Sequence, residues 1–375
     1  MDDEARTAVE RAEREPLLGH RADAVRAAID AAAPFLEPAD HAILRARLLL
    51  RLASVKMTEG DYEGADQALE AVGRHAPDDT MLRFLAGVRA CRIAIRRGPE
   101  PRALASATLV QAAAQLPAFG TNDGWEVVTV EVALAIAELA LHDDPPDATA
   151  FEAIAQIVAG VVEPDVEFAG HQLLAAFALS IGEPIRAARS LRAAVPIARD
   201  AGSPADEIEA RLALAGALVA TTDAIARDEA AAAVTRALAL AKQHGLAELH
   251  AAALIAEAGV LASAGKTAHA IDRVLELARE AAQRHDIAQY VASVGIMAEL
   301  YARAGDHVSA FRTIVEAHRA LADATASDVG ERFRPLLARL RDRIGADRLS
   351  AIARDVEHAN RLADQIAHEK ARDPS

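Results

Sequence analysis

Turn-forming positions recur along this chain at intervals of about 40 residues, and this spacing limits the possible folds more than any other feature. Most of them are glycines, and each is flanked on both sides by a stretch with the apolar spacing of a helix. The positions are Gly19, Gly60, Gly98, about Pro145, Gly182, about residue 225, Gly265 and Gly305. A unit of this length predicts a helical hairpin that stacks on its neighbours, because one hairpin cannot bury its apolar face alone.

Small residues stand at fixed distances from these turns. The frame around Gly305 consists of Ala298, Tyr301, Ala310, Ile314 and Ala317. The same offsets around Gly265 hold Ala258, Leu261, Ala270, Val274 and Leu277. Small side chains let two helix axes approach closely, so these positions predict where the two helices of a hairpin cross.

The composition favours the same fold. Alanine makes up about a quarter of the 375 residues, and arginine far outnumbers lysine. Alanine and arginine are among the best helix formers. No stretch alternates apolar and polar residues for long enough to form a pair of strands. The chain is therefore predicted to be all-α.

The frame around Gly305 resembles that of the tetratricopeptide repeat, and the unit around Gly60 adds Tyr62 after the turn and Pro77 near the expected repeat end. The resemblance covers roughly residues 5 to 322 in about eight degenerate units, with a period nearer 40 than 34 residues. It implies a right-handed superhelical α-solenoid over residues 1–328, in which the first helix of each hairpin lines a concave groove. The HEAT or armadillo class is the structural alternative, since its units also have about 40 residues.

Residues 329–375 are expected to form a pair of C-terminal capping helices. The apolar residues on one face of the first of them are Phe333, Leu336, Leu337, Leu340 and Ile344. A terminal repeat has no following neighbour to cover its apolar face, so a helix pair with a polar outer side is required there. The alternative is that these helices form a homodimer with a second copy.

The charge balance excludes several classes of partner. The chain has 41 Lys+Arg against 56 Asp+Glu, a net charge of -15, whereas phosphate binding needs concentrated positive charge, so we expect no nucleic acid partner. The longest uncharged run, residues 103–122, contains polar residues, proline and glycine, so we expect no membrane insertion. The single cysteine, Cys91, and the acidic residues 1–15 favour the cytoplasm over secretion.

No catalytic motif stands out. The chain contains no glycine-rich phosphate loop and no HExxH pair, and Cys91 occupies a small-residue packing position. We therefore expect no catalytic residue, no cofactor and no metal site. An enzyme is the least favoured class of function.

The clearest candidate binding site is a cluster of positive charge. Nine basic residues occupy two predicted first helices that hold no acidic residue. They are Arg45, Arg47, Arg51 and Lys56 in residues 41–58, and Arg83, Arg89, Arg92, Arg96 and Arg97 in residues 80–98. The inward-facing candidates for partner binding are Arg47, Arg51, Arg89, Arg92 and Arg96. Arginine holds carboxylates bidentately, so a solvent-facing cluster predicts an acidic partner. The alternative is pairing with acids on neighbouring second helices, such as Asp66 and Glu70.

Residues 118–125 contain the only tryptophan, Trp125, in the longest interval between turns. An exposed Trp125 would be a contact point for a partner. The alternative is that it anchors the loop on the solenoid.

An α-solenoid without catalytic motifs predicts a scaffold or adaptor, of the kind found in bacterial proteins, that binds a protein or peptide in its groove. The alternative is a regulator that changes shape when it binds a peptide or signal. Later first helices carry acids, among them Glu131 and Glu138, so the groove is predicted to be polarised.

Overall fold

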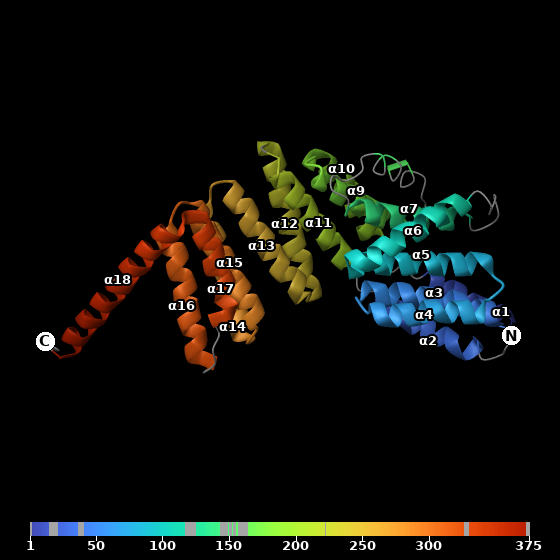
Figure 1. The fold of residues 1–375 in the computed structure, drawn as a ribbon, viewed down its shortest axis with the longest axis horizontal. Coiled ribbons are helices and arrows are strands. Elements are labelled where there is room, and N and C mark those ends of the chain that lie inside the picture. The colour runs from blue at the N-terminus through green and yellow to red at the C-terminus, as the bar shows by residue number, and fades with distance from the viewer. Residues whose placement is uncertain are drawn as a thin grey trace. The chain divides into compact units, whose positions relative to one another are not determined.

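The protein is all-α, as predicted. The computed structural model describes residues 2–14, 22–36, 41–116, 125–142, 149, 152, 155–156, 164–221, 223–325 and 330–372, and none of them is in a strand. From the N-terminus onward, the helices are α1 (Asp2–Arg14), α2 (Ala22–Ala32), η1 (Ala33–Leu36), α3 (Ala42–Thr58), α4 (Tyr62–His75), α5 (Thr80–Arg97), α6 (Pro99–Gln115) and α7 (Trp125–Ala140). They are followed by α9 (Pro164–Ser180), α10 (Pro184–Asp200), α11 (Pro204–Val219), α12 (Ala224–His244), α13 (Ala247–Ser263), α14 (Thr267–Gln283), α15 (Ile287–Arg303), α16 (His307–Thr325), α17 (Gly330–Ile344) and α18 (Ala346–Arg372) (Figure 1).

The helices form serial hairpins around the predicted turns. Gly60, Gly182, Gly265 and Gly305 have φ angles of 76°, 76°, 75° and 82°, a left-handed conformation that favours glycine. The turn expected near residue 225 falls between α11 and α12. Gly19 and Pro145 lie outside the described residues. The alanines five residues past four of these turns are completely buried: Ala65, Ala187, Ala270 and Ala310.

Side-chain caps fix where several helices begin. The carboxylates of Asp61 and Asp79 accept hydrogen bonds from the backbone N–H groups of Gly64 (2.9 Å) and Leu82 (3.0 Å). Asp306 caps α16 in the same way through Ser309 (2.9 Å). Such caps satisfy backbone donors that have no partner within the helix.

The chain divides into two compact units, and unit 1 comprises Met1–Thr222 and Ala239–Leu249. In unit 1, α3 packs against α4 and α5, and α5 packs against α6 and α7. One apolar cluster joins α3, α4 and α5, and a second joins α5, α6 and α7. Cys91 is buried in the second cluster, as its small-residue position predicts.

Unit 2 comprises Asp223–Leu238 and His250–Ser375. Its main apolar cluster contains residues of α13, α14, α15 and α16, together with Phe333, Leu336 and Leu340 of α17. A Cβ atom on Gly295 of α15 would lie 2.9 Å from Cδ2 of Leu336, so the missing side chain gives α17 room to approach. The proposed division into a repeat array and two capping helices, at residue 328, stays a prediction, as does the right-handed superhelix.

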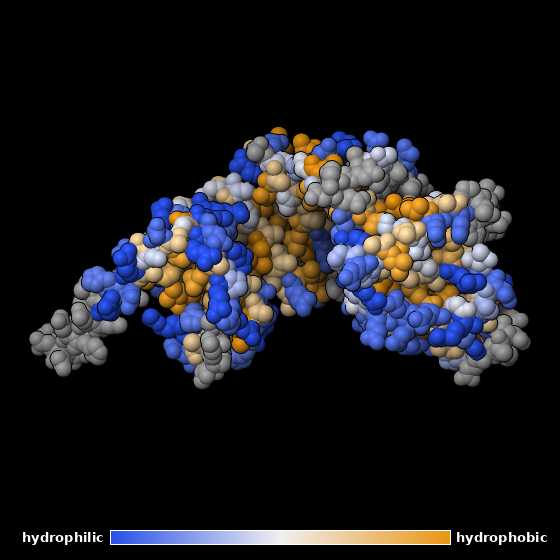
Figure 2. All heavy atoms as spheres, viewed as in Figure 1, coloured by the Kyte–Doolittle hydropathy of each residue, from blue (hydrophilic) through white to orange (hydrophobic). Residues whose placement is uncertain are grey.

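Apolar side chains are also exposed on second helices. In Figure 2 orange surface lies over α6, where Leu104 and Val110 are 74% and 68% exposed. None of the described helices combines the length and the apolar character that crossing a membrane requires.

Candidate functional site

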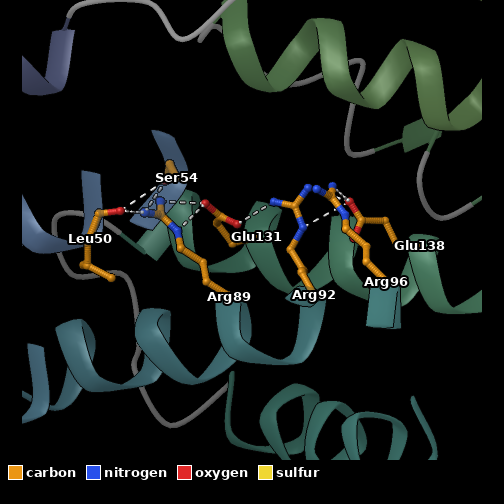
Figure 3. Close-up of polar contacts among 7 residues, drawn as sticks. All are labelled: Leu50, Ser54, Arg89, Arg92, Arg96, Glu131 and Glu138. Atoms are coloured by element: carbon orange, nitrogen blue, oxygen red, sulfur yellow. Dashed lines mark hydrogen bonds and ion pairs between the residues drawn. The ribbon is translucent and has the colours of Figure 1, made fainter. Parts of the chain in front are cut away.

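The predicted arginines of α5 lie between α3 and α7 and point towards α7. Figure 3 shows Arg89, Arg92 and Arg96 facing Glu131 and Glu138 of α7. Arginines at i, i+3 and i+7 share one side of a helix, and so do glutamates seven residues apart. Because α5 packs directly against α7, the two rows meet.

Arg89 joins three consecutive first helices. Its Nε and Nη2 atoms donate to Oε1 of Glu131 at 3.1 and 2.8 Å. Its Nη1 atom donates to the backbone oxygen of Leu50 and to Oγ of Ser54 in α3, both at 2.8 Å. All donor-bearing nitrogens of this guanidinium group are therefore engaged within the protein.

Arg92 bridges the two glutamates. Its Nη1 atom donates to Oε2 of Glu131 at 3.1 Å, while Nε and Nη2 donate to Oε1 of Glu138 at 3.2 and 2.6 Å. Arg96 adds one more hydrogen bond, from Nη2 to the same Oε1 atom at 2.9 Å. We call these five residues, Arg89, Arg92, Arg96, Glu131 and Glu138, the ion-pair network.

The network is largely buried, and its pKa values reflect that position. Burial alone would raise the pKa of Glu131, but the charges and hydrogen bonds of Arg89 and Arg92 outweigh it and hold the pKa at about 2. The pKa of Glu138 is lowered in the same way, against the effect of burial, by Arg92 and Arg96. The pKa of Arg92 is raised, because the two glutamates outweigh the burial that would lower it. Both carboxylates are therefore ionised at neutral pH.

The other two predicted arginines are paired as well. Arg47 of α3 binds both carboxylate oxygens of Glu13, and this hydrogen bonding raises the pKa of Arg47. Nη2 of Arg51 lies 3.7 Å from Oδ2 of Asp165 at the start of α9. Burial lowers the pKa of Arg51 although the charge of Asp165 acts to raise it.

The expectation that the α5 arginines face solvent is wrong in part, and the alternative, pairing with acids of a neighbouring helix, holds for Arg89 and Arg92. The side chains of Arg89 and Arg92 are only 16% and 15% exposed, and their acids come from the next first helix rather than from a second helix. Of the expected second-helix acids, Asp66 does pair, with Arg97 at 2.6 Å. Matching seven-residue spacings of arginine and glutamate on consecutive first helices are the signal that could have revealed the network.

Arg96 differs from the other arginines of the network. Its side chain is 37% exposed, and the structure gives it one hydrogen bond although a guanidinium group has five N–H donors. Three guanidinium groups against two carboxylates leave the network with one net positive charge. This surplus charge lies at the exposed edge of the network.

Trp125 begins α7, but its side chain lies outside the described residues. That Arg47, Arg51, Arg89, Arg92, Arg96 and Trp125 bind a partner stays a prediction. Among the side chains that the structure describes, no three histidine, cysteine, aspartate or glutamate residues are placed to hold a metal ion.

Comparison with solved structures identifies similar folds. A signal transduction ATPase with numerous domains (STAND) from Pyrococcus horikoshii, which has a tetratricopeptide repeat sensor, is 14% identical with a TM-score of 0.57. The match covers 94% of this chain and 54% of that one, so this chain spans about half the length of that protein.

A Rap protein complexed with Competence and Sporulation Factor is 15% identical with a TM-score of 0.52, over 87% of this chain and 94% of that one. Comparison with protein-family models and with curated proteins gave no match. Identities this low show the fold alone. The chain has the fold of a tetratricopeptide-like α-solenoid.

Proposed function

We propose that this protein is a non-catalytic binding module that holds a segment of another protein, or a peptide, along the first helices of its hairpins. The observation that carries the proposal is the arrangement of α3, α5 and α7, three first helices that pack in a row and are joined by the hydrogen bonds of Arg89. Consecutive first helices of a helical repeat present side chains from several units to one extended ligand. The proposal places this activity in the cytoplasm.

The similar structures support a binding role. One contains a tetratricopeptide repeat described as a sensor, and the other was solved with a bound factor. We extend from them only the class of function, because identity of 14% to 15% does not carry a ligand from one protein to another.

We propose that the ligand carries an acidic segment that binds at the N-terminal hairpins. Arg96 would supply the first contact, because it is the exposed member of a network with a surplus positive charge. Arg47 of α3 is 32% exposed and would add a second contact, for which the ligand would compete with Glu13. Arg89, Arg92 and Arg51 would not contact the ligand but would hold the first helices in place, since each is already engaged by a carboxylate of the protein.

Affinity capture from the native host, followed by mass spectrometry and by binding measurements with the purified partner, tests this proposal. Arg96→Glu should weaken binding. Added salt should weaken binding by the wild-type protein, because salt screens exposed charge pairs. Arg189→Glu is the matched control, since Arg189 is an exposed arginine on the second helix α10. Equal binding by the two variants would count against an acidic contact at Arg96.

A peptide-sensing regulator is the second candidate, favoured by the sensor and the bound factor of the two similar structures. A sensor should change in compactness when it binds its ligand, whereas a scaffold should keep one shape. Small-angle scattering with and without the purified partner separates them. An unchanged radius of gyration at saturation would favour the scaffold.

A further inference from the structure

Helix α17 carries a local excess of positive charge in an acidic protein. Five arginines and two acids occupy its 15 residues, although the whole chain has a net charge of -15. The arginines are Arg332, Arg334, Arg339, Arg341 and Arg343. A helix with this balance attracts carboxylates.

Three of these arginines have partners within unit 2. Arg334 pairs with Glu331 at 2.5 Å, Arg341 with Asp342 at 3.0 Å, and Arg343 with Glu299 of α15 at 2.7 Å. Arg332 and Arg339 are exposed and form no ion pair with any residue that the structure describes. They are the positions where an added carboxylate has no competitor.

The two unpaired arginines share one side of α17 with Arg343. Arg332, Arg339 and Arg343 are spaced by seven and four residues, which places them on one side of a helix. Arg343 pairs with Glu299 of α15 from that side, so these three arginines lie next to the neighbouring first helix. The buried residues Phe333, Leu336 and Leu340 hold α17 in place from the adjoining side.

The same arrangement of arginines occurs in the ion-pair network, with its acids present. Arg92 and Arg96 stand six and two residues before the turn glycine Gly98, and Arg339 and Arg343 stand six and two residues before Gly345. In unit 1, the neighbouring helix α7 supplies two glutamates seven residues apart to these arginines. Among the described residues no such acidic helix faces α17.

We propose that α17 is a docking surface for an acidic helix of a partner protein, which places two carboxylates seven residues apart against Arg332 and Arg339. Those arginines are themselves seven residues apart, about 10.5 Å along the axis, so a helix packed alongside matches them with the same spacing. The inference rests on the proposed binding function but uses a different surface from Arg96.

The test uses the full chain and a fluorescein-labelled, stapled helical peptide of alanine and glutamine with two glutamates seven residues apart. Fluorescence anisotropy should show binding that weakens with added salt. The double variant Arg332→Ala, Arg339→Ala should bind about tenfold more weakly, because two exposed charge pairs are lost. A peptide with its glutamates two residues apart, on different sides of the helix, should also bind about tenfold more weakly.

The matched control is Arg348→Ala, Arg354→Ala, which removes two exposed arginines from α18 and should leave binding within about twofold of wild type. Circular dichroism melting confirms that each variant folds. Equal loss in the control, no dependence on glutamate spacing, or a preference for single-stranded DNA would overturn the proposal. A wild-type protein that is dimeric, with a monomeric α17 double variant, would also overturn it, because a second copy of the chain would then occupy the surface. Loss of partner binding in Arg96→Glu tests the proposed function separately.

Discussion

At the scale of single residues, burial decides what each arginine of the first helices can do. Arg92 and Arg96 are one helical turn apart, yet the side chain of Arg92 is 15% exposed and that of Arg96 is 37% exposed. A buried charge needs its partner to offset the loss of hydration, whereas an exposed charge is hydrated by water. Arg92 therefore stabilises the fold through its buried partners, whereas Arg96 depends less on the carboxylate that it contacts.

Replacing Arg92 by alanine should cost about 3 to 5 kcal/mol of folding free energy, because Glu131 and Glu138 would lose a buried partner. Arg96→Ala is the matched variant and should cost less than about 1 kcal/mol. Urea unfolding followed by circular dichroism measures both. Equal effects would show that the network is not organised by burial.

The pH dependence of stability should include a contribution from Glu131. Its folded pKa of about 2 is below its unfolded value of about 4.3, so its contribution of about 3 kcal/mol is complete above pH 4.3 and is lost as the pH falls towards 2. Urea unfolding of wild type and of Glu131→Gln between pH 6 and about 2.5 tests this. The difference between them should shrink with falling pH, and a constant difference would contradict the assignment.

At the scale of helices, glycines on first helices differ in what surrounds them. Gly259 of α13 has open space where a Cβ atom would be, while Gly295 of α15 faces Leu336 of α17. Sequence patterns could predict both helices, but they gave no sign that a side chain of α17 fills the position above Gly295. Such an approach depends on how hairpins pack, and single-helix patterns do not report packing.

Gly259→Ala should raise the unfolding free energy by about 0.5 to 1 kcal/mol, because alanine favours the helix and meets no neighbour. Gly295→Leu should lower it by about 1 to 3 kcal/mol, because the larger side chain displaces Leu336. Thermal melting measures both changes. A stabilising Gly295→Leu would mean that α17 does not pack closely on α15.

At the scale of the whole molecule, local sequence patterns predict the repeat architecture, whereas the ion pairs can be predicted only by comparing helices that lie far apart in the chain. Gly60, Gly182, Gly265 and Gly305 mark turns because a left-handed backbone needs glycine, and that requirement is local to the sequence. The pairing of Arg89 with Glu131 joins residues 42 positions apart. It depends on which helices become neighbours, so patterns within one helix, or within one hairpin, do not reveal it.

Deleting residues 331 to 375 should destabilise unit 2, because Phe333, Leu336 and Leu340 complete its apolar cluster. The newly exposed face should cause aggregation or dimerisation. Size-exclusion chromatography with light scattering measures the outcome. A truncated protein that stays monomeric and equally stable would show that α17 and α18 do not cap the array.

Site-specific photo-crosslinking is the direct test of whether a partner binds along the first helices. A photoreactive phenylalanine would replace Ile43 of α3 or Ala176 of α9 and, as controls, Glu70 of α4 or Arg189 of α10, all four of which are exposed. We expect the two first-helix positions to crosslink one and the same partner in the native host, and the two second-helix positions to give no crosslink to it. Crosslinks confined to Glu70 and Arg189, or no crosslink at any first-helix position, would contradict it.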